Sequence, residues 1–231
     1  MIRPRLTLVG LLFASAAFAS IDGKLDQLHN AGADIKTLSA DIKLTDVDTG
    51  GLGDDARWFD ATLIVQRVGD DTEALVSFTT KHVGDKEKNK ATSARRDVLL
   101  QGRTVTDQDY EAKKQTIRKL DGKIDLFKLG EGPFPLPVGQ TKEDVKAQFD
   151  ITEKGDTLTL DPKPGTQLAE KYKHIAVTIG ASDRFPTKIE TTDKNETTIT
   201  TVEITNVKIN PTLQASAFTL PAPGAGWNVV K

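Results

Sequence analysis

The chain has 231 residues, a formal net charge of −2 and no cysteine. The missing cysteine excludes thiol nucleophiles, zinc thiolates and redox dithiols, so the fold must be stabilised by its core alone. The near-neutral charge gives no electrostatic reason to expect nucleic acid or an anionic membrane surface as a partner.

The first residues are typical of an export signal. Arg3 and Arg5 precede the apolar run Leu6–Phe18, and Ala17-Phe18-Ala19 forms an A-x-A cleavage site. The run is shorter than the roughly 20 residues that a membrane-spanning helix needs. We therefore expect residues 1–19 to be a signal peptide cleaved after Ala19, and residues 20–231 to form a single domain in the periplasm.

Hydrophobic spacing then predicts a short amphipathic helix followed by strands. Leucines at helical spacing indicate a helix over Ser20–Ala33, and strict alternation over Leu38–Thr45 indicates a strand with one buried face. Trp58–Val68 alternates in the same way, with Phe59, Ala61, Leu63 and Val65 on one face. Arg67 continues that face, so we expect its guanidinium to point inward and to need hydrogen-bond acceptors.

Further short strands are expected along most of the remaining chain. Close spacing and turn residues between them favour antiparallel sheet, and parallel α/β architecture is disfavoured because helices do not alternate with strands. The expected strands are 74–80, 97–106 around a turn at Gly102, 115–120, 156–160, 174–179, 186–192 and 197–207.

One loop interrupts the strands. Leu129–Gly139 contains three prolines, which prevent a regular ladder, together with the apolar Phe134, Leu136 and Val138. We expect a helix over Thr141–Phe149 after it, with Val145 and Phe149 on one face at i, i+4. Such a segment fits a lid over a sheet and fits an ordinary core plug equally well.

The order of these segments resembles the outer-membrane lipoprotein carrier (LolA) family over nearly the whole mature chain. The resemblance is carried by 35–42, by 62–67 ending in arginine, by 98–104 turning on Gly102, by Pro133-Phe134, by 149–163, by 197–207 and by 218–221. It implies a mainly β fold with short helices, an incomplete, curved antiparallel half-barrel covered by a helical lid. The implied function is a carrier that shelters the acyl chains of a lipoprotein or lipid and moves them between membranes.

The resemblance also implies site residues and partners. Arg67 corresponds to the family arginine that bonds lid backbone and latches the cavity shut. The apolar cavity would be lined by Phe59, Leu63, Val65, Val76, Phe78, Phe134, Leu136, Val145 and Phe149. Expected partners are an inner-membrane exporter and an outer-membrane acceptor for a monomeric carrier.

Two features depart from the family pattern. After the Gly102 turn, where relatives have aromatic residues, this chain has Val105-Thr106-Asp107-Gln108, and aromatic residues total only 6%. Val68 also replaces the proline that follows the family arginine. The cargo therefore stays open, and so does an alternative in which the same fold senses lipids or lipoproteins and signals to a partner. A third reading is a structural β domain with a fully packed interior.

Other chemistry finds little support. His29, His82 and His174 are far apart in sequence and lack ligand spacing, and the acidic stretch 46–55 does not fit a calcium loop. No catalytic motif occurs, so we expect neither an enzyme nor a cofactor. The basic residues from Lys81 to Arg96 are expected to form a solvated loop, with contact to an acidic partner or to phospholipid headgroups as the alternative.

Overall fold

A computed structural model describes residues 20–50, 55–69, 71–84, 91–122, 138–180 and 185–231. Their elements are α1 (Ile21–Ala33), β1 (Thr37–Asp48), β2 (Asp55–Val68), β3 (Asp71–Val83), β4 (Thr92–Gln101), β5 (Thr104–Asp109), β6 (Lys114–Lys119), α2 (Lys142–Gln148), β7 (Phe149–Lys154), β8 (Thr157–Pro162), β9 (Tyr172–Ile179), β10 (Pro186–Asp193), β11 (Thr198–Ile209), the 3₁₀-helix η1 (Ala215–Phe218) and β12 (Asn228–Val230).

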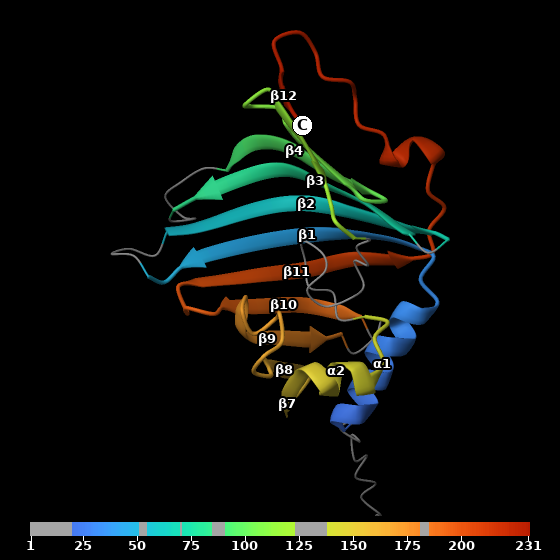
Figure 1. The fold of residues 1–231 in the computed structure, drawn as a ribbon, viewed down its shortest axis with the longest axis vertical. Helices are drawn as coiled ribbons and strands as arrows, with labels where there is room; N and C mark the ends of the chain where they lie inside the picture. Colours follow the sequence, from blue (N-terminus) through green and yellow to red (C-terminus); the bar gives the residue numbers. More distant parts are fainter. Residues whose placement is uncertain (1–19, 51–54, 70, 85–90, 123–137, 181–184) are drawn as a thin grey trace, which may run out of the picture.

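All described strands belong to one open, curved sheet (Figure 1). The order is β12-β6-β5-β4-β3-β2-β1-β11-β10-β9-β8-β7, and each neighbouring pair is antiparallel except β12 with β6. Register shifts in the β1–β11, β2–β3 and β3–β4 ladders are β-bulges, which bend strands and increase their twist. The expected half-barrel fold is confirmed.

Both α-helices pack at the β7 end of the sheet (Figure 1). The Ser20 side chain accepts a hydrogen bond from Gly23 N and caps α1, whose Leu25 and Leu28 are buried against the sheet. Thr141 caps α2 in the same way, as its sequence predicts. The helix expected to extend through Phe149 ends at Gln148, because Phe149 adopts an extended conformation and begins β7.

The last segment of the chain, residues 210–231, crosses the sheet face opposite α1. Phe218 is buried there, and its carbonyl accepts a bond from Gln101 Nε2 at 3.2 Å, while the Pro221 carbonyl accepts one from Gln108 Nε2 at 2.9 Å. The edge of Trp227 then contacts Tyr110, and β12 pairs with β6. The helices and the last segment therefore pack on opposite faces of the sheet.

Candidate functional site

Three predicted lining residues of β2 and β3 lie on the sheet face whose buried cluster also contains side chains of α1 and α2. Register pairs Leu63 with Val76 and Val65 with Ala74 across the two strands. Leu63, Val65 and Val76 are each at most 3% exposed. They belong to the same buried cluster as Leu25, Leu28, Val138, Val145 and Phe149, and we call Leu63, Val65 and Val76 the dry floor.

The remaining predicted lining residues lie in different surroundings. Phe59 and Phe78 extend the same face beyond the dry floor, where they are only half-buried and meet edge to face with ring centroids 5.9 Å apart. Val145 on α2 and Phe149 on β7 are buried in the helix-covered core. Phe134 and Leu136 lie outside the described residues.

Arg67 lies beside the end of α1. Its Nη2 donates to the carbonyl oxygen of Gly32 at 3.3 Å, although the residue remains exposed. The last carbonyls of a helix lack intrahelical partners and carry the negative end of the helix dipole, so a cation is favoured there. α1 has no basic residue in its own last turn, and the sheet supplies this one.

Gly32 allows a close approach between α1 and the segment that follows the Pro-rich loop. A Cβ at Gly32 would lie 2.3 Å from Gly139 N and 2.6 Å from the carbonyl carbon of Val138. Gly139 N donates to Leu28 O at 3.0 Å, and Gly139 O lies 3.1 Å from His29 Nδ1. Gly32 could not be recognised from the sequence, because only the packing of a distant segment shows why a side chain is excluded there.

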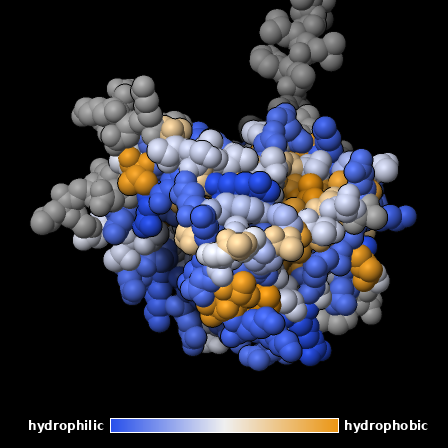
Figure 2. Space-filling model, turned by 90° about the horizontal axis from the view of Figure 1, so that it is seen from above, coloured by the Kyte–Doolittle hydropathy of each residue, from blue (hydrophilic) through white to orange (hydrophobic). Residues whose placement is uncertain are grey.

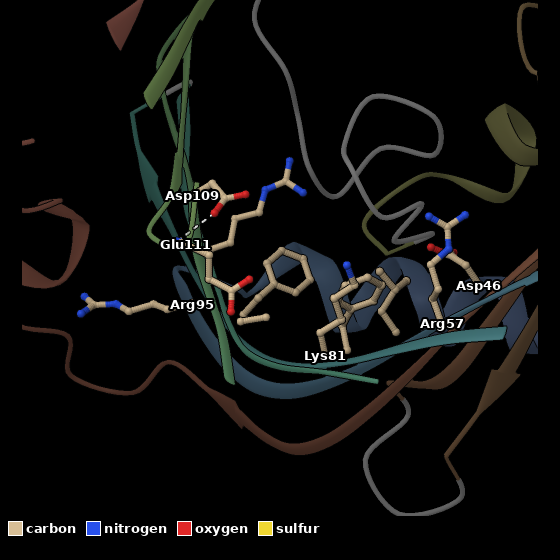
Figure 3. Close-up of a pocket in the computed structure, with 11 residues that line it drawn as sticks. Asp46, Arg57, Lys81, Arg95, Asp109 and Glu111 are labelled. Carbon is tan, nitrogen blue, oxygen red and sulfur yellow. Dashed lines mark hydrogen bonds between the residues drawn. The ribbon is translucent and has the colours of Figure 1, made fainter. Parts of the chain in front are cut away.

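A pocket of about 300 Å³ opens beyond the dry floor (Figure 3). Its apolar wall is formed by Leu44, Phe59, Phe78 and Ala94, and its charged residues are Asp46, Arg57, Lys81, Arg95, Arg96, Asp109 and Glu111. Lys81 was expected to lie in a solvated loop. The structure instead places it on β3, opposite Phe59. Arg57, Asp109 and Glu111 were also missed. Arg57 follows an ordinary strand pattern, whereas Asp109 ends β5 and Glu111 lies in the turn after it, and only the curved sheet brings them to one pocket.

An ion pair occupies the position where the family pattern has aromatic residues. Arg96 donates to both carboxylate oxygens of Asp107, at 2.8 and 2.6 Å. The pKa of Arg96 is raised mainly by this hydrogen-bonded partner. Gln108, the next residue, is buried on the opposite face in a network with Tyr110 and Gln115. Where the family pattern has aromatic side chains, this chain therefore has an ion pair in which Arg96 and Asp107 are hydrogen-bonded to each other.

The surface seen from the β12 side is mainly hydrophilic, with apolar residues in separate small patches (Figure 2). No helix among the described residues is long and apolar enough to cross a membrane. Within the same residues, no three His, Cys, Asp or Glu side chains are grouped so that they could hold a metal ion.

Comparison with known proteins gives one family match and several similar folds. The sequence matches the family model of the outer membrane lipoprotein carrier protein LolA over residues 89–221. An uncharacterized conserved protein from Thermus thermophilus is similar over 90% of this chain and 96% of its own, with 10% identity and a TM-score of 0.49. A LolA superfamily protein from Nitrosomonas europaea shares 9% identity over 85% of this chain and 96% of its own, with a TM-score of 0.37. A chain of the Pseudomonas aeruginosa MucA/MucB complex shares 10% identity over 86% of this chain and 60% of its own, with a TM-score of 0.42. The search of curated proteins found no match.

Proposed function

Because the chain belongs to the outer membrane lipoprotein carrier protein LolA family, we propose that it is a periplasmic carrier that shelters the acyl chains of a lipoprotein or lipid. In this proposal residues 1–19 direct export and are removed, and the mature monomer transfers its cargo from an inner-membrane exporter to an outer-membrane acceptor. No metal or cofactor takes part.

One observation carries the proposal: an apolar stretch of the curved sheet, the dry floor, belongs to one buried cluster with side chains of both α-helices and Val138. Polar contacts also join α1 to its surroundings. Near its start, Lys24 Nζ bonds Gly155 O and lies 3.7 Å from Glu153 Oε2, and ion pairs connect α1 to α2. At the far end, Arg67 and the Gly139 segment hold Gly32, Leu28 and His29.

Burial of an acyl chain provides ample affinity. Each methylene removed from water contributes about 0.8 kcal/mol, so a chain of about 16 methylenes gains at most about 13 kcal/mol. The harder task for a carrier is release. An empty closed state that competes with the filled open state solves it, because the closing contacts return when cargo leaves.

Arg67 supports such a closed state. Its bond to Gly32 O joins β2 to the end of α1, and a hydrogen bond from a charged donor typically contributes about 1.5–3 kcal/mol. We propose that this bond is lost when α1 moves aside for an acyl chain, so that Arg67 acts as the latch. Cargo then lies against Phe59, Leu63, Val65, Val76 and Phe78 of the sheet, with Phe134, Leu136, Val145 and Phe149 completing the cavity.

One feature favours displacement. Gln140 follows Gly139, and among the described residues neither polar atom of its buried side-chain amide has a hydrogen-bond partner. A buried unsatisfied polar group costs about 1–3 kcal/mol. The closed arrangement carries this penalty, so opening at this point relieves part of its own cost.

The proposal is tested by purifying the mature protein from a periplasmic fraction and identifying bound lipid by native mass spectrometry and lipid extraction. We expect acylated cargo in the wild type and stronger retention in Arg67→Leu, with transfer to acceptor vesicles slowed by roughly tenfold or more. Arg103→Leu is the matched control, because Arg103 is an exposed arginine at the β4–β5 turn.

The outcomes separate the carrier from its latch. Protein without lipid in every sample would contradict the carrier and favour an interaction protein that recognises a partner instead. Cargo that is bound but released equally by Arg67→Leu and Arg103→Leu would retain the carrier and contradict the latch.

A further inference from the structure

The pocket beyond the dry floor combines an apolar base with separated charges of both signs. Figure 3 shows Arg57 and Asp46 at one end, Asp109 and Glu111 at the other, and Lys81 between them. Phe59 and Phe78 form the apolar base. The proposed carrier function assigns no role to this charge arrangement.

Two of the cations in the pocket are available to a ligand. In the described part of the chain, no hydrogen bond or ion pair engages the side chain of Arg57 or Lys81, even though Arg57 faces Asp46 across the β1–β2 ladder. Arg96 is already bound to Asp107. Arg95 points away from the pocket (Figure 3), and its guanidinium stacks over the Tyr110 ring at 4.1 Å.

The carboxylates at the other end are partly available, although Asp109 lies opposite Arg96 in the β4–β5 ladder and attracts its guanidinium. Asp109 Oδ1 accepts bonds from the backbone N–H groups of Glu111 and Ala112, which fix the carboxylate at the β5–β6 turn. The Glu111 side chain is exposed. Asp46, at the cationic end, accepts from Thr200 Oγ1 at 2.8 Å and so has a hydrogen-bond donor of its own. The pocket thus offers a cationic end at Arg57 and Lys81 and an anionic end at Asp109 and Glu111.

The pocket is continuous with the dry floor. Phe59 is followed two residues later by Ala61, which pairs with Phe78, and then by Leu63, which pairs with Val76. These residues lie on one face along two adjacent strands, so an extended acyl chain on the floor would end at the charged pocket.

We propose that this pocket binds a zwitterionic lipid headgroup, a phosphate joined to a primary ammonium as in phosphoethanolamine, while the lipid's acyl chain lies along the floor. Arg57 and Lys81 bind the phosphate, since guanidinium and ammonium donors form charge-assisted bonds with its oxygens. Asp109 and Glu111 accept from the ammonium. A glyceryl anchor without charge would satisfy neither end. This inference rests on the proposed carrier function and specifies its cargo class.

The test uses three lipids with one identical acyl chain at concentrations that keep them monomeric: lysophosphatidylethanolamine, lysophosphatidylglycerol and an uncharged monoacylglycerol. Each displaces a fluorescent fatty acid from the full mature protein, and isothermal titration with glycerophosphoethanolamine measures the headgroup without its chain. We expect lysophosphatidylethanolamine to bind most tightly, lysophosphatidylglycerol less tightly and monoacylglycerol least. The affinities of the first and the last should differ by about tenfold.

Substitutions then assign the two ends. Arg57→Gln with Lys81→Gln is expected to remove the preference for both phospholipids and leave monoacylglycerol binding unchanged. Glu111→Gln is expected to weaken binding of the ethanolamine lipid alone. Lys43→Gln removes a positive charge from the opposite face of the neighbouring β1; it is the control and should change none of the affinities.

The results distinguish three failures. Equal binding of all three lipids, or equal weakening of all three by Arg57→Gln with Lys81→Gln, would overturn the headgroup site and leave the carrier intact. Glycerophosphoethanolamine bound as tightly as the lysolipid would overturn it in favour of a soluble phosphate ligand. Binding of no lipid at all would overturn the carrier function itself.

Discussion

The dry floor and the charged pocket lie on the same face of the same two strands, yet they differ in what covers them. Leu63 and Val76 are 3% exposed and belong to the buried core cluster, whereas Phe59 and Phe78, one or two pairs further along, are half-buried among Arg57, Lys81 and Glu111. Both stretches have the same period-two pattern in sequence. The comparison shows that strand periodicity sets which residues share a face, while the tertiary packing decides which part of that face excludes water.

The largest expected effect separates two leucines on this face. Leu63→Ala removes a fully covered side chain and should lower the free energy of unfolding by about 2–5 kcal/mol. Leu44→Ala removes a half-buried side chain from the pocket and should lower it by only about 1 kcal/mol. Urea unfolding followed by circular dichroism measures both, and equal losses would show that the pocket end is as dry as the floor.

The next largest effect concerns the close approach between α1 and the Val138–Gly139 segment. Replacing a helical glycine with alanine normally stabilises a helix by roughly 0.5–1 kcal/mol. Gly32→Ala should do the opposite and cost about 1–3 kcal/mol, because its Cβ would overlap the backbone of Val138 and Gly139. Gly122→Ala is the control, since a Cβ there meets no atom within 4 Å. A stabilised Gly32→Ala protein would show that α1 does not pack this tightly.

An alkaline titration probes the opposite face, under β3–β6. Burial and a hydrogen bond to Asp97 raise the pKa of Tyr110 to about 12, and burial raises the pKa of Tyr172. The unfolded chain loses the Tyr110 proton near pH 10 while the folded chain keeps it, so this stability is present below pH 10 and is lost as pH rises toward 12. Tyrosinate absorbance should show a component at about pH 12 that Tyr110→Phe removes. Ionisation of Tyr110 at its ordinary pKa would contradict the buried network.

The smallest effect concerns the exposed ion pairs between α1 and α2. Lys146 bonds Asp22 at 2.5 Å and lowers its pKa, and Lys142 lies 3.3 Å from Asp26. The contribution of Asp22 is present above its ordinary pKa and is lost as pH falls through the lowered value. Lys146→Gln should therefore reduce the Tm slightly at neutral pH and low salt, and not at all in high salt, because exposed pairs are screened. Lys194→Gln, an exposed lysine elsewhere, serves as control, and a salt-independent loss would mean that Lys146 acts through packing.

Much of the fold was predictable because its strands alternate cleanly. The strands expected over 186–192 and 197–207 are observed as β10 and β11, and Gly102 occupies the left-handed conformation that its turn requires. β7 was missed, because Phe149 and Val145 fit one helix face in sequence, although the backbone changes to an extended conformation at Phe149. β12 was missed as well, since three exposed residues acquire strand geometry only by pairing with β6.

The candidate site was less predictable. The face shared by Phe59, Leu63, Val65 and Arg67 could be read from spacing, since side chains two apart on a strand point the same way. The partner of Arg67 could not, because Gly32 O lies 35 residues away in sequence. The pairing of Arg96 with Asp107 likewise depends on the β4–β5 register.

The fold class, the family resemblance and the apolar face of β2 could be predicted without a structure, because they depend on local periodicity and on the order of segments along the chain. The folded chain was needed to show that one part of that face belongs to the buried core cluster, that Gly32 admits the Gly139 segment, and that Arg57 and Lys81 lie beside Phe59 without an ion-pair partner among the described residues. The physical reason is that coverage and charge pairing depend on residues far apart in sequence, which are brought within contact distance only when the twelve strands of the described chain curve into one sheet.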